Sequence, residues 1–431
     1  MSQRRWRTLR AIMRARRVLL IGALVVGVVI ALAQANLSWL LGIVIFVLAL
    51  LVSVMLHELG HFLTAKKFHM KVTQFFVGFG QTLWSRQRGE TEYGVKALPF
   101  GGFVKIIGMS SLEEVDEADE PRTFRRQPAW QRAIVLVAGS FMHFALAFVL
   151  LVGLALGIGV QNSTVIGSVA SCVPANAKLL SQGSCKGSLG RSPAAVAGIR
   201  PGDKVTEIGG RPVRNWVQLG DVIREQPAGQ PVRVVVDRDG AQHILSITPA
   251  AVPQRKGSYF GIVEKVFQPV GPVRAVSYAG SSFGQVLAGS GSAIARLPSA
   301  LPDLFARDRA KTPAGDVSSV VGAANIAGQA VEEGGGWQFT VSTLLLIVIS
   351  LNIFVGAFNL LPLLPLDGGH LALVFYEKIR SWLARLRRRP DPGLVDLERL
   401  LPLSIGVFAL LVGLSVVLIA ADIFNPIHLP Q

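Results

Sequence analysis

Residues 51–68 read LVSVMLHELGHFLTAKKF and place three titratable side chains, His57, Glu58 and His61, at the end of an apolar run. The run begins at Leu37 and is long enough to cross a bilayer, which takes about 20 apolar residues in a helix. Ionisable groups within a membrane span are costly, so they mark functional sites by default. This stretch therefore predicts a membrane helix that carries a functional site.

The spacing of these side chains points to a metal. On a helix, residues four apart lie on one face, so the imidazoles of His57 and His61 can hold one zinc ion. Glu58 can then reach a metal-bound water, whose pKa zinc lowers toward 7, and take its proton for attack on a peptide carbonyl. The chain has only seven histidines, so a chance HExxH pattern is rare. The alternative is two histidines that merely cap the end of a helix.

The composition is that of a membrane protein. Of the 431 residues, 51% are hydrophobic and only 16% are charged, unlike an ordinary soluble chain. Four segments reach the length of a membrane span, and a fifth is slightly short. They cover residues 37–63, 134–160, 339–361 and 403–421, with the short one at 18–35. The short segment lacks a clear cleavage site and leads straight into the next span, so we do not expect a signal peptide.

Most of the flanking charge is basic, and the net charge is +16. Seven arginines lie at the N-terminus, and Lys378, Arg380, Arg385 and residues 387–389 precede the last span. By the positive-inside rule both segments are cytoplasmic, and such segments contact anionic membrane lipids rather than nucleic acid. Five spans then place residues 64–132 inside, and residues 161–338 and the C-terminus outside. The histidines accordingly lie near the cytoplasmic face of the cell membrane.

The two cysteines fit this topology. Cys172 and Cys185 both fall in the long outer region, where an oxidising environment permits a disulfide. We therefore expect a bridge between them, which would stabilise the domain by about 3 kcal/mol. The alternative is two reduced thiols in a core.

A catalytic zinc usually takes a third protein ligand and keeps its fourth position for water. We favour Asp367, which lies in FNLLPLLPLDGGH, residues 358–370. Asn359 and two prolines break the preceding span there, and irregular backbone at membrane depth is tolerated only inside protein or beside water. The broken span reaches the same cytoplasmic depth as the two histidines. His370 is the rival ligand, since one helical turn puts it on the same side.

Two β-rich regions accompany the spans. Residues 84–108 are β-branched and aromatic with interspersed glycines, which predicts short strands or a hairpin on the cytoplasmic side. In the outer region we expect strands at 204–208, 232–236 and 243–248, and a helix near 216–225. The segments AGIRPGD, EIGGRPV and VVDRDG resemble a PDZ domain, a module that usually binds extended peptides by adding a strand.

Together these motifs resemble the site-2 proteases, the intramembrane zinc metalloproteases of peptidase family M50 that include bacterial regulators of sigma-E-type stress responses. The resemblance runs from residue 37 to the C-terminus. It is carried by HELGH at 57–61, FVGFG at 76–80, GETEYGVKALPFGGFVKIIG at 89–108, the PDZ-like segments and NLLPLLPLDGG at 359–369. It implies that His57, His61 and Asp367 bind Zn²⁺, that Glu58 is the general base and acid, and that Asn359 helps to hold the substrate strand.

The resemblance also implies partners. The substrates would be single-pass membrane proteins such as anti-sigma factors, already cut by an upstream site-1 protease, with the PDZ-like domain gating their access. A non-catalytic membrane scaffold or PDZ receptor with a structural zinc is the alternative function. A metal transporter is weaker, because no chain of intramembrane carboxylates marks a path.

Two features depart from the family. Its third span commonly carries Gly-Pro-x-x-Asn, whereas this chain reads GSFMH at 139–143. That leaves His143 without an assigned role, and a buried interhelical hydrogen bond is the interpretation we favour over a role in the site. The basic N-terminal tail with its added span is the second departure.

The predicted fold is thus a multi-span α-helical membrane protein of about five helices, with a cytoplasmic-side β-hairpin region and an extracytoplasmic PDZ-like α+β domain. The expected division is a basic tail and extra helix at 1–36, a first catalytic part at 37–160, the PDZ-like domain at 161–255, a linker or amphipathic region at 256–338, and a second catalytic part at 339–431.

Overall fold

The computed structural model describes two compact units. One comprises Met1–Leu151 with Gly280–Gln431, and the other is Val152–Ala279. The described residues are 36–109, 113–159, 164–176, 179, 185–214, 216–254, 257–265, 267, 269–306, 309, 312–332, 336–396 and 398–427. The expected short span at 18–35 and the basic tail lie outside these residues.

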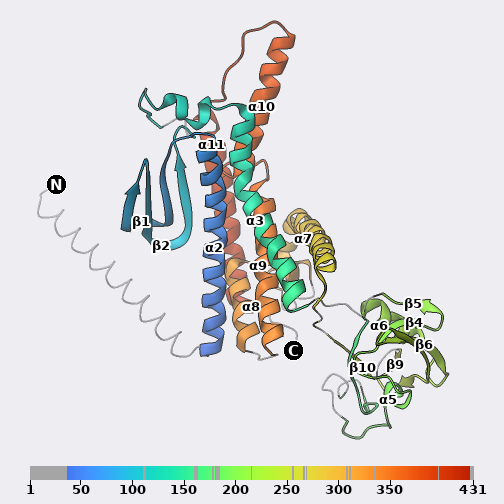
Figure 1. Cartoon of the computed structure of the whole chain (residues 1–431). Helices are drawn as coiled ribbons and strands as arrows, with labels where there is room; N and C mark the ends of the chain where they lie inside the picture. Colours follow the sequence, from blue (N-terminus) through green and yellow to red (C-terminus); the bar gives the residue numbers. More distant parts are fainter. Residues whose placement is uncertain are drawn as a thin grey trace, which may run out of the picture. The chain divides into compact units, whose positions relative to one another are not determined.

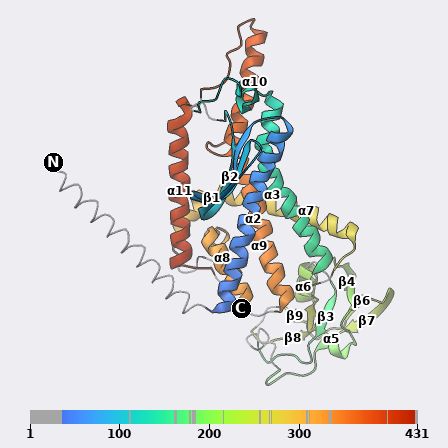
Figure 2. The ribbon, with the colours of Figure 1, turned by 60° about the vertical axis from the view of Figure 1, so that its left-hand side comes forward.

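In the described part of the chain, four helices are long and apolar enough to cross a membrane. They are α2 (Leu37–Lys67), α3 (Ala129–Gly157), α9 (Trp337–Asn359) and α11 (Leu401–Phe424), and they coincide with the four full-length spans expected from the sequence. The Asn36 side chain caps α2 by accepting a hydrogen bond from the Ser38 amide at 3.1 Å. Helices α2 and α9 lie side by side in both views (Figures 1 and 2).

The span α9 is broken where the sequence predicts. It ends at Asn359, and after seven intervening residues α10 (Asp367–Leu386) begins with Asp367 in its first turn. The glycines after Asp367 allow the connecting loop to fold onto this turn. A Cβ at Gly368 would lie 2.3 Å from the Leu360 carbonyl carbon, and one at Gly369 would lie 2.6 Å from that of Leu363. Asp367 is therefore fixed at the start of α10 by tight backbone packing.

A buried ion pair joins α10 to α3. The guanidinium of Arg132 lies 2.9 Å from the carboxylate of Glu377, and both side chains are almost inaccessible to solvent. The second Glu377 oxygen accepts a hydrogen bond from the Val395 amide at 2.9 Å. Because a buried charge is tolerated only when it is paired, this pair sets how α10 packs beside α3.

The strands β1 (Val72–Arg88) and β2 (Thr91–Ile106) form an antiparallel hairpin beside α2 (Figures 1 and 2). Each strand bends and pairs twice, since Gln74 is partnered by both Lys105 and Glu92. The hairpin thus contributes four runs, in the order 101–106, 72–79, 91–98 and 82–88. It begins at Val72 rather than at residue 84 as expected, because VTQFFVGFG is itself rich in β-branched and aromatic residues.

The unit Val152–Ala279 holds a four-stranded antiparallel sheet in the order β5-β4-β6-β7. The expected strand and helix are present as β4 (Lys204–Ile208) and α6 (Trp216–Glu225), and the next two expected strands as β6 (Val232–Arg238) and β7 (Ala241–Ile247). The other elements are α5 (Pro193–Val196), β3 (Ile166–Val169), β5 (Arg211–Pro212), β8 (Ala250–Ala251), β9 (Ser258–Tyr259) and β10 (Ile262–Glu264). A disulfide joins Cys172 and Cys185 in this unit.

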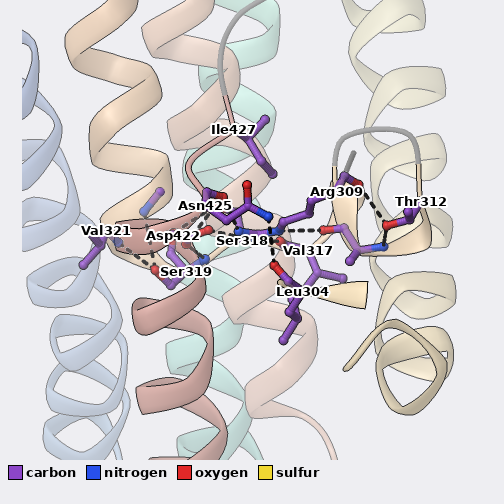
Figure 3. Close-up of polar contacts among 12 residues, drawn as sticks. Leu304, Arg309, Thr312, Val317, Ser318, Ser319, Val321, Asp422, Asn425 and Ile427 are labelled. Carbon is purple, nitrogen blue, oxygen red and sulfur yellow. Dashed lines mark hydrogen bonds and ion pairs between the residues drawn. The ribbon is translucent and has the colours of Figure 1, made fainter. Parts of the chain in front are cut away.

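The region expected to be a linker contains helices α7 (Pro272–Ala300) and α8 (Val320–Glu332), with a polar cluster before α8. Figure 3 shows this cluster at the C-terminal end of α11. Arg309, 2% exposed, pairs with Asp422 at 2.8 Å and donates to the carbonyls of Ala314, Val317 and Asn425. Asp422 also accepts from the Ser319 amide at 2.6 Å. The end of α11 is therefore fastened to residues 309–319 by a desolvated ion pair.

Replacing Arg309 by methionine should lower the free energy of unfolding by about 3–5 kcal/mol, because Asp422 would remain buried without a counter-charge. Arg399→Met is the matched control, since the Arg399 side chain is 87% exposed and its pair with Asp396 lies at the surface; it should change that free energy by less than about 1 kcal/mol. The measurement is thermal unfolding of both variants in the same detergent. Equal losses in the two variants would contradict this account of the cluster.

Candidate metal centre

Three side chains from two distant segments converge within the membrane-spanning unit. Nε2 of His57 and Nε2 of His61 lie 3.1 Å apart, and each lies 3.3 Å from Oδ2 of Asp367. Both histidines are buried, at 8% and 7% exposed. In the described part of the chain, the donor atoms of His57, His61 and Asp367 lie close enough together to hold one metal ion.

The distances fit a tetrahedral metal. Zinc bonds to histidine nitrogen and carboxylate oxygen at about 2.0–2.1 Å, so neighbouring ligand atoms of a tetrahedral site lie about 3.3 Å apart. The three separations of 3.1, 3.3 and 3.3 Å match that edge length. Two imidazoles and one carboxylate, with a fourth position left for water, are also the donor set of a catalytic zinc. The residues present therefore fit zinc.

The two histidines are held differently. Nδ1 of His61 donates to the Val135 carbonyl on α3 at 2.7 Å, which leaves the lone pair of Nε2 directed at the cluster. Nδ1 of His57 is buried and has no hydrogen-bond partner among the described residues. The ring of His57 lies 5.0 Å from that of His143, measured between centroids.

Gly139 on α3 makes room for both rings. A Cβ at this position would lie 2.5 Å from Cε1 of His57 and 2.5 Å from Nε2 of His61, closer than real Cβ contacts. A similar close approach occurs between Gly60 and the backbone of Ala138. The glycine in GSFMH thus allows α3 to pack directly against the face of α2 that carries the histidines.

Glu58 lies beside this cluster in sequence and is held by the hairpin. Its Oε2 accepts a hydrogen bond from the Val104 amide at 3.0 Å. Val104 belongs to the run 101–106, whose other side pairs with β1. One carboxylate oxygen of Glu58 is therefore held by strand backbone.

The other predicted residues lie as follows. His370 is outside the group of donor atoms that gathers at Asp367, although it follows on the same helix. Asn359 is the last residue of α9 and is half-buried. Cys172 and Cys185 lie in the other unit.

Sequence reasoning missed several residues around the cluster. Val104 and Val135 contribute only backbone groups, which leave no signal in the sequence. The sequence analysis noted Gly139 only because GSFMH at 139–143 differs from the family's Gly-Pro-x-x-Asn pattern. Of these residues, Asn352 could have been singled out from the sequence, because it is an amide in the middle of an apolar span and polar residues at that depth are functional by default.

Comparison with known proteins identifies the family. The model of peptidase family M50 matches residues 45–389. The zinc metalloprotease Rip1 of Mycobacterium tuberculosis (strain Erdman) is 38% identical over 90% of this chain and 99% of its own length. Rip1 of Mycolicibacterium smegmatis is 36% identical over 91% of this chain and 99% of its own length. The metalloprotease MmpA of Caulobacter vibrioides is 28% identical over 78% of this chain and 85% of its own length.

The four membrane-length helices, the tetrahedral donor set and the match over most of the chain agree with one another. The chain therefore belongs to peptidase family M50, the site-2 protease family, and is a membrane metalloendopeptidase whose cofactor is zinc.

Proposed function

We propose that this protein cleaves peptide bonds within or near the membrane-spanning segments of single-pass proteins such as anti-sigma factors, after an upstream protease has trimmed their outer domain. The observation that carries the proposal is the position of the donor cluster on α2. His57, Glu58 and His61 lie at the end of an apolar helix rather than in a surface cleft. A peptide bond that reaches them must itself be at membrane depth.

The residues divide the chemistry between them. His57, His61 and Asp367 would hold the zinc, which when bound polarises the scissile carbonyl and makes water a nucleophile at neutral pH. Glu58 takes one proton from the attacking water through Oε1, while the Val104 amide steadies Oε2. As the C–N bond breaks, Glu58 delivers that proton to the leaving amine nitrogen. The second proton of the water leaves the new carboxyl group for the amine, so the products are a carboxylate and an ammonium group.

The alternative of a scaffold with a structural zinc is disfavoured by the number of ligands. Structural zinc sites are closed by four protein side chains. The described residues bring three donors together, and His370 is not among them. An open fourth position supports catalysis.

Changing Glu58 to glutamine should leave zinc content near one equivalent and lower turnover by about 10²–10⁴-fold, because the base is lost while the ligands remain. The measurement is cleavage of a tagged single-pass anti-sigma factor in proteoliposomes, together with metal analysis. Glu117→Gln, at an exposed position, is the control and should cleave at the wild-type rate. Full activity of Glu58→Gln would rule out the assigned base.

We also propose that the run 101–106 of β2 binds the substrate as an added strand. A helix hides its amide bonds, so the substrate must unwind before attack, and an extended segment can pair with an exposed strand edge. The support is that β1 pairs with one side of this run, while the amide of Val104 is directed at Glu58. A strand added there would lie beside the catalytic carboxylate, and Asn359 would help to hold it.

Cysteine cross-linking tests this strand addition. In the Glu58→Gln background, cysteine at Lys105 should form disulfides with substrate cysteines placed within a few residues of the cut site. Cysteine at Arg88, in the run 82–88 at the opposite edge of the sheet, is the control and should not. The native cysteines are already paired, so each variant has one reactive thiol. Equal cross-linking at both positions would contradict the clamp.

We further propose that the unit Val152–Ala279 is an extracytoplasmic PDZ-like domain that gates access. Its antiparallel sheet and the AGIRPGD turn before β4 support the assignment. The N-terminus and the active-site end of α2 would then face the cytoplasm.

Removing residues 192–249 should raise cleavage of an untrimmed substrate toward that of a trimmed one, because exclusion by the domain is lost while the metal centre is not touched. The ratio of the two cleavage rates is the measurement, with zinc content as the control for folding. An unchanged ratio in a zinc-loaded deletion would refute gating.

A further inference from the structure

Three buried polar side chains form a hydrogen-bonded chain inside the membrane-spanning unit. Ser53 on α2, Asn352 on α9 and His143 on α3 are only 2%, 1% and 3% exposed. Nδ2 of Asn352 lies 3.0 Å from Oγ of Ser53, and its Oδ1 lies 2.7 Å from Nδ1 of His143. Polar groups at this depth are retained only where they are satisfied and useful. The chain ends at the ring of His143, which is next to that of His57.

The direction of each hydrogen bond in this chain is determined. The Asn352 amide nitrogen also donates to the Val348 carbonyl at 2.8 Å, and a carbonyl can only accept. Oγ of Ser53 donates to the Ala49 carbonyl at 3.0 Å, so it accepts from Asn352. Oδ1 of Asn352 is consequently an acceptor, and Nδ1 of His143 must donate to it. In a neutral imidazole, Nε2 of His143 then carries the lone pair.

His57 requires a hydrogen-bond acceptor at its Nδ1. When its Nε2 binds a metal, its Nδ1 carries the proton, and a buried N–H without an acceptor is costly. Among the described residues that Nδ1 has no partner, whereas Nδ1 of His61 has the Val135 carbonyl. The second nitrogen of a metal-bound histidine almost always donates to an acceptor that orients the ring.

The ring of His143 lies next to the ring of His57, where its Nε2 lone pair can serve as that acceptor. Gly139, over which the His57 ring lies, and His143 are four residues apart on α3 and so share one face. The ring centroids of His57 and His143 are 5.0 Å apart, inclined at 41°. Two imidazoles joined by an N–H···N hydrogen bond of about 3 Å have centroids about 5 Å apart, and the observed separation of the two rings matches that value. His143 does not belong to the donor group itself.

We propose that His143 is a positioning residue for the metal centre: its Nε2 accepts the Nδ1 proton of His57, and the Asn352–Ser53 chain holds His143 in the tautomer that can do so. This inference rests on the proposed zinc site. It gives a role to the buried imidazole at position 143, which the donor group itself does not use. It also couples three spans, α2, α3 and α9, to the orientation of one ligand.

The test is zinc affinity, measured by chelator competition on the full chain in detergent, with Glu58→Gln as the common background so that activity plays no part. His143→Phe keeps a ring but removes the acceptor, and it should weaken zinc binding about 10–100-fold. His143→Gln restores an acceptor oxygen and should recover most of that loss. Asn352→Leu frees the His143 tautomer and should weaken binding in the same direction, which keeps the test decisive if His143→Phe does not fold. Phe144→Leu, the neighbouring position on α3, should bind zinc like the background.

Cobalt substitution supplies a second readout. The visible absorption bands of Co²⁺ report ligand geometry, and they should shift in His143→Phe and Asn352→Leu but not in Phe144→Leu. Wild-type zinc affinity in both His143→Phe and Asn352→Leu, or equal weakening in His143→Phe and His143→Gln, would overturn the inference and leave the proposed protease intact. Absence of zinc from the Glu58→Gln background itself would instead refute the proposed metal site.

Discussion

The structure depends on bringing three donor atoms within 3.1–3.3 Å of one another inside an apolar helix bundle. Two come from consecutive turns of α2, and the third comes from a segment about three hundred residues later. The glycines around the site serve this convergence: Gly139 lets α3 approach the histidines, and Gly368 and Gly369 let the loop fold onto the first turn of α10. Each would clash if it carried a Cβ, so the site is set by close backbone packing.

The same apolar surroundings require the other buried polar groups to find partners within the protein. A charge or N–H group that leaves water must be paired within the protein. Arg309 with Asp422, Arg132 with Glu377, and the chain from Ser53 to His143 each meet that requirement by joining segments distant in sequence. Each pairing therefore fixes helix packing as well as satisfying its own atoms. Among the described residues, Nδ1 of His57 and Oγ of Ser140 are buried exceptions near the donor cluster.

Much of the architecture was predictable. The four full-length spans follow from hydropathy, because a membrane helix must satisfy its own backbone and present apolar side chains for about 20 residues. Residues 204–208 and 216–225 were placed correctly because their periodicity is strong. The hairpin was predicted to begin at residue 84 but begins at Val72, since VTQFFVGFG is itself rich in β-branched and aromatic residues.

The sequence by itself determined the HExxH pattern, since the placement of His57 and His61 on one face follows from helix geometry, and the break at Asn359 follows from two prolines. It favoured Asp367 over His370 without excluding His370, because both lie on one helical turn. Only the tertiary structure decided which of them reaches the histidines, that the Val104 amide donates to Glu58, and that Asn352 is hydrogen-bonded to His143. Those contacts join side chains and backbone groups from separate helices, and spacing along one element carries no information about what packs against it.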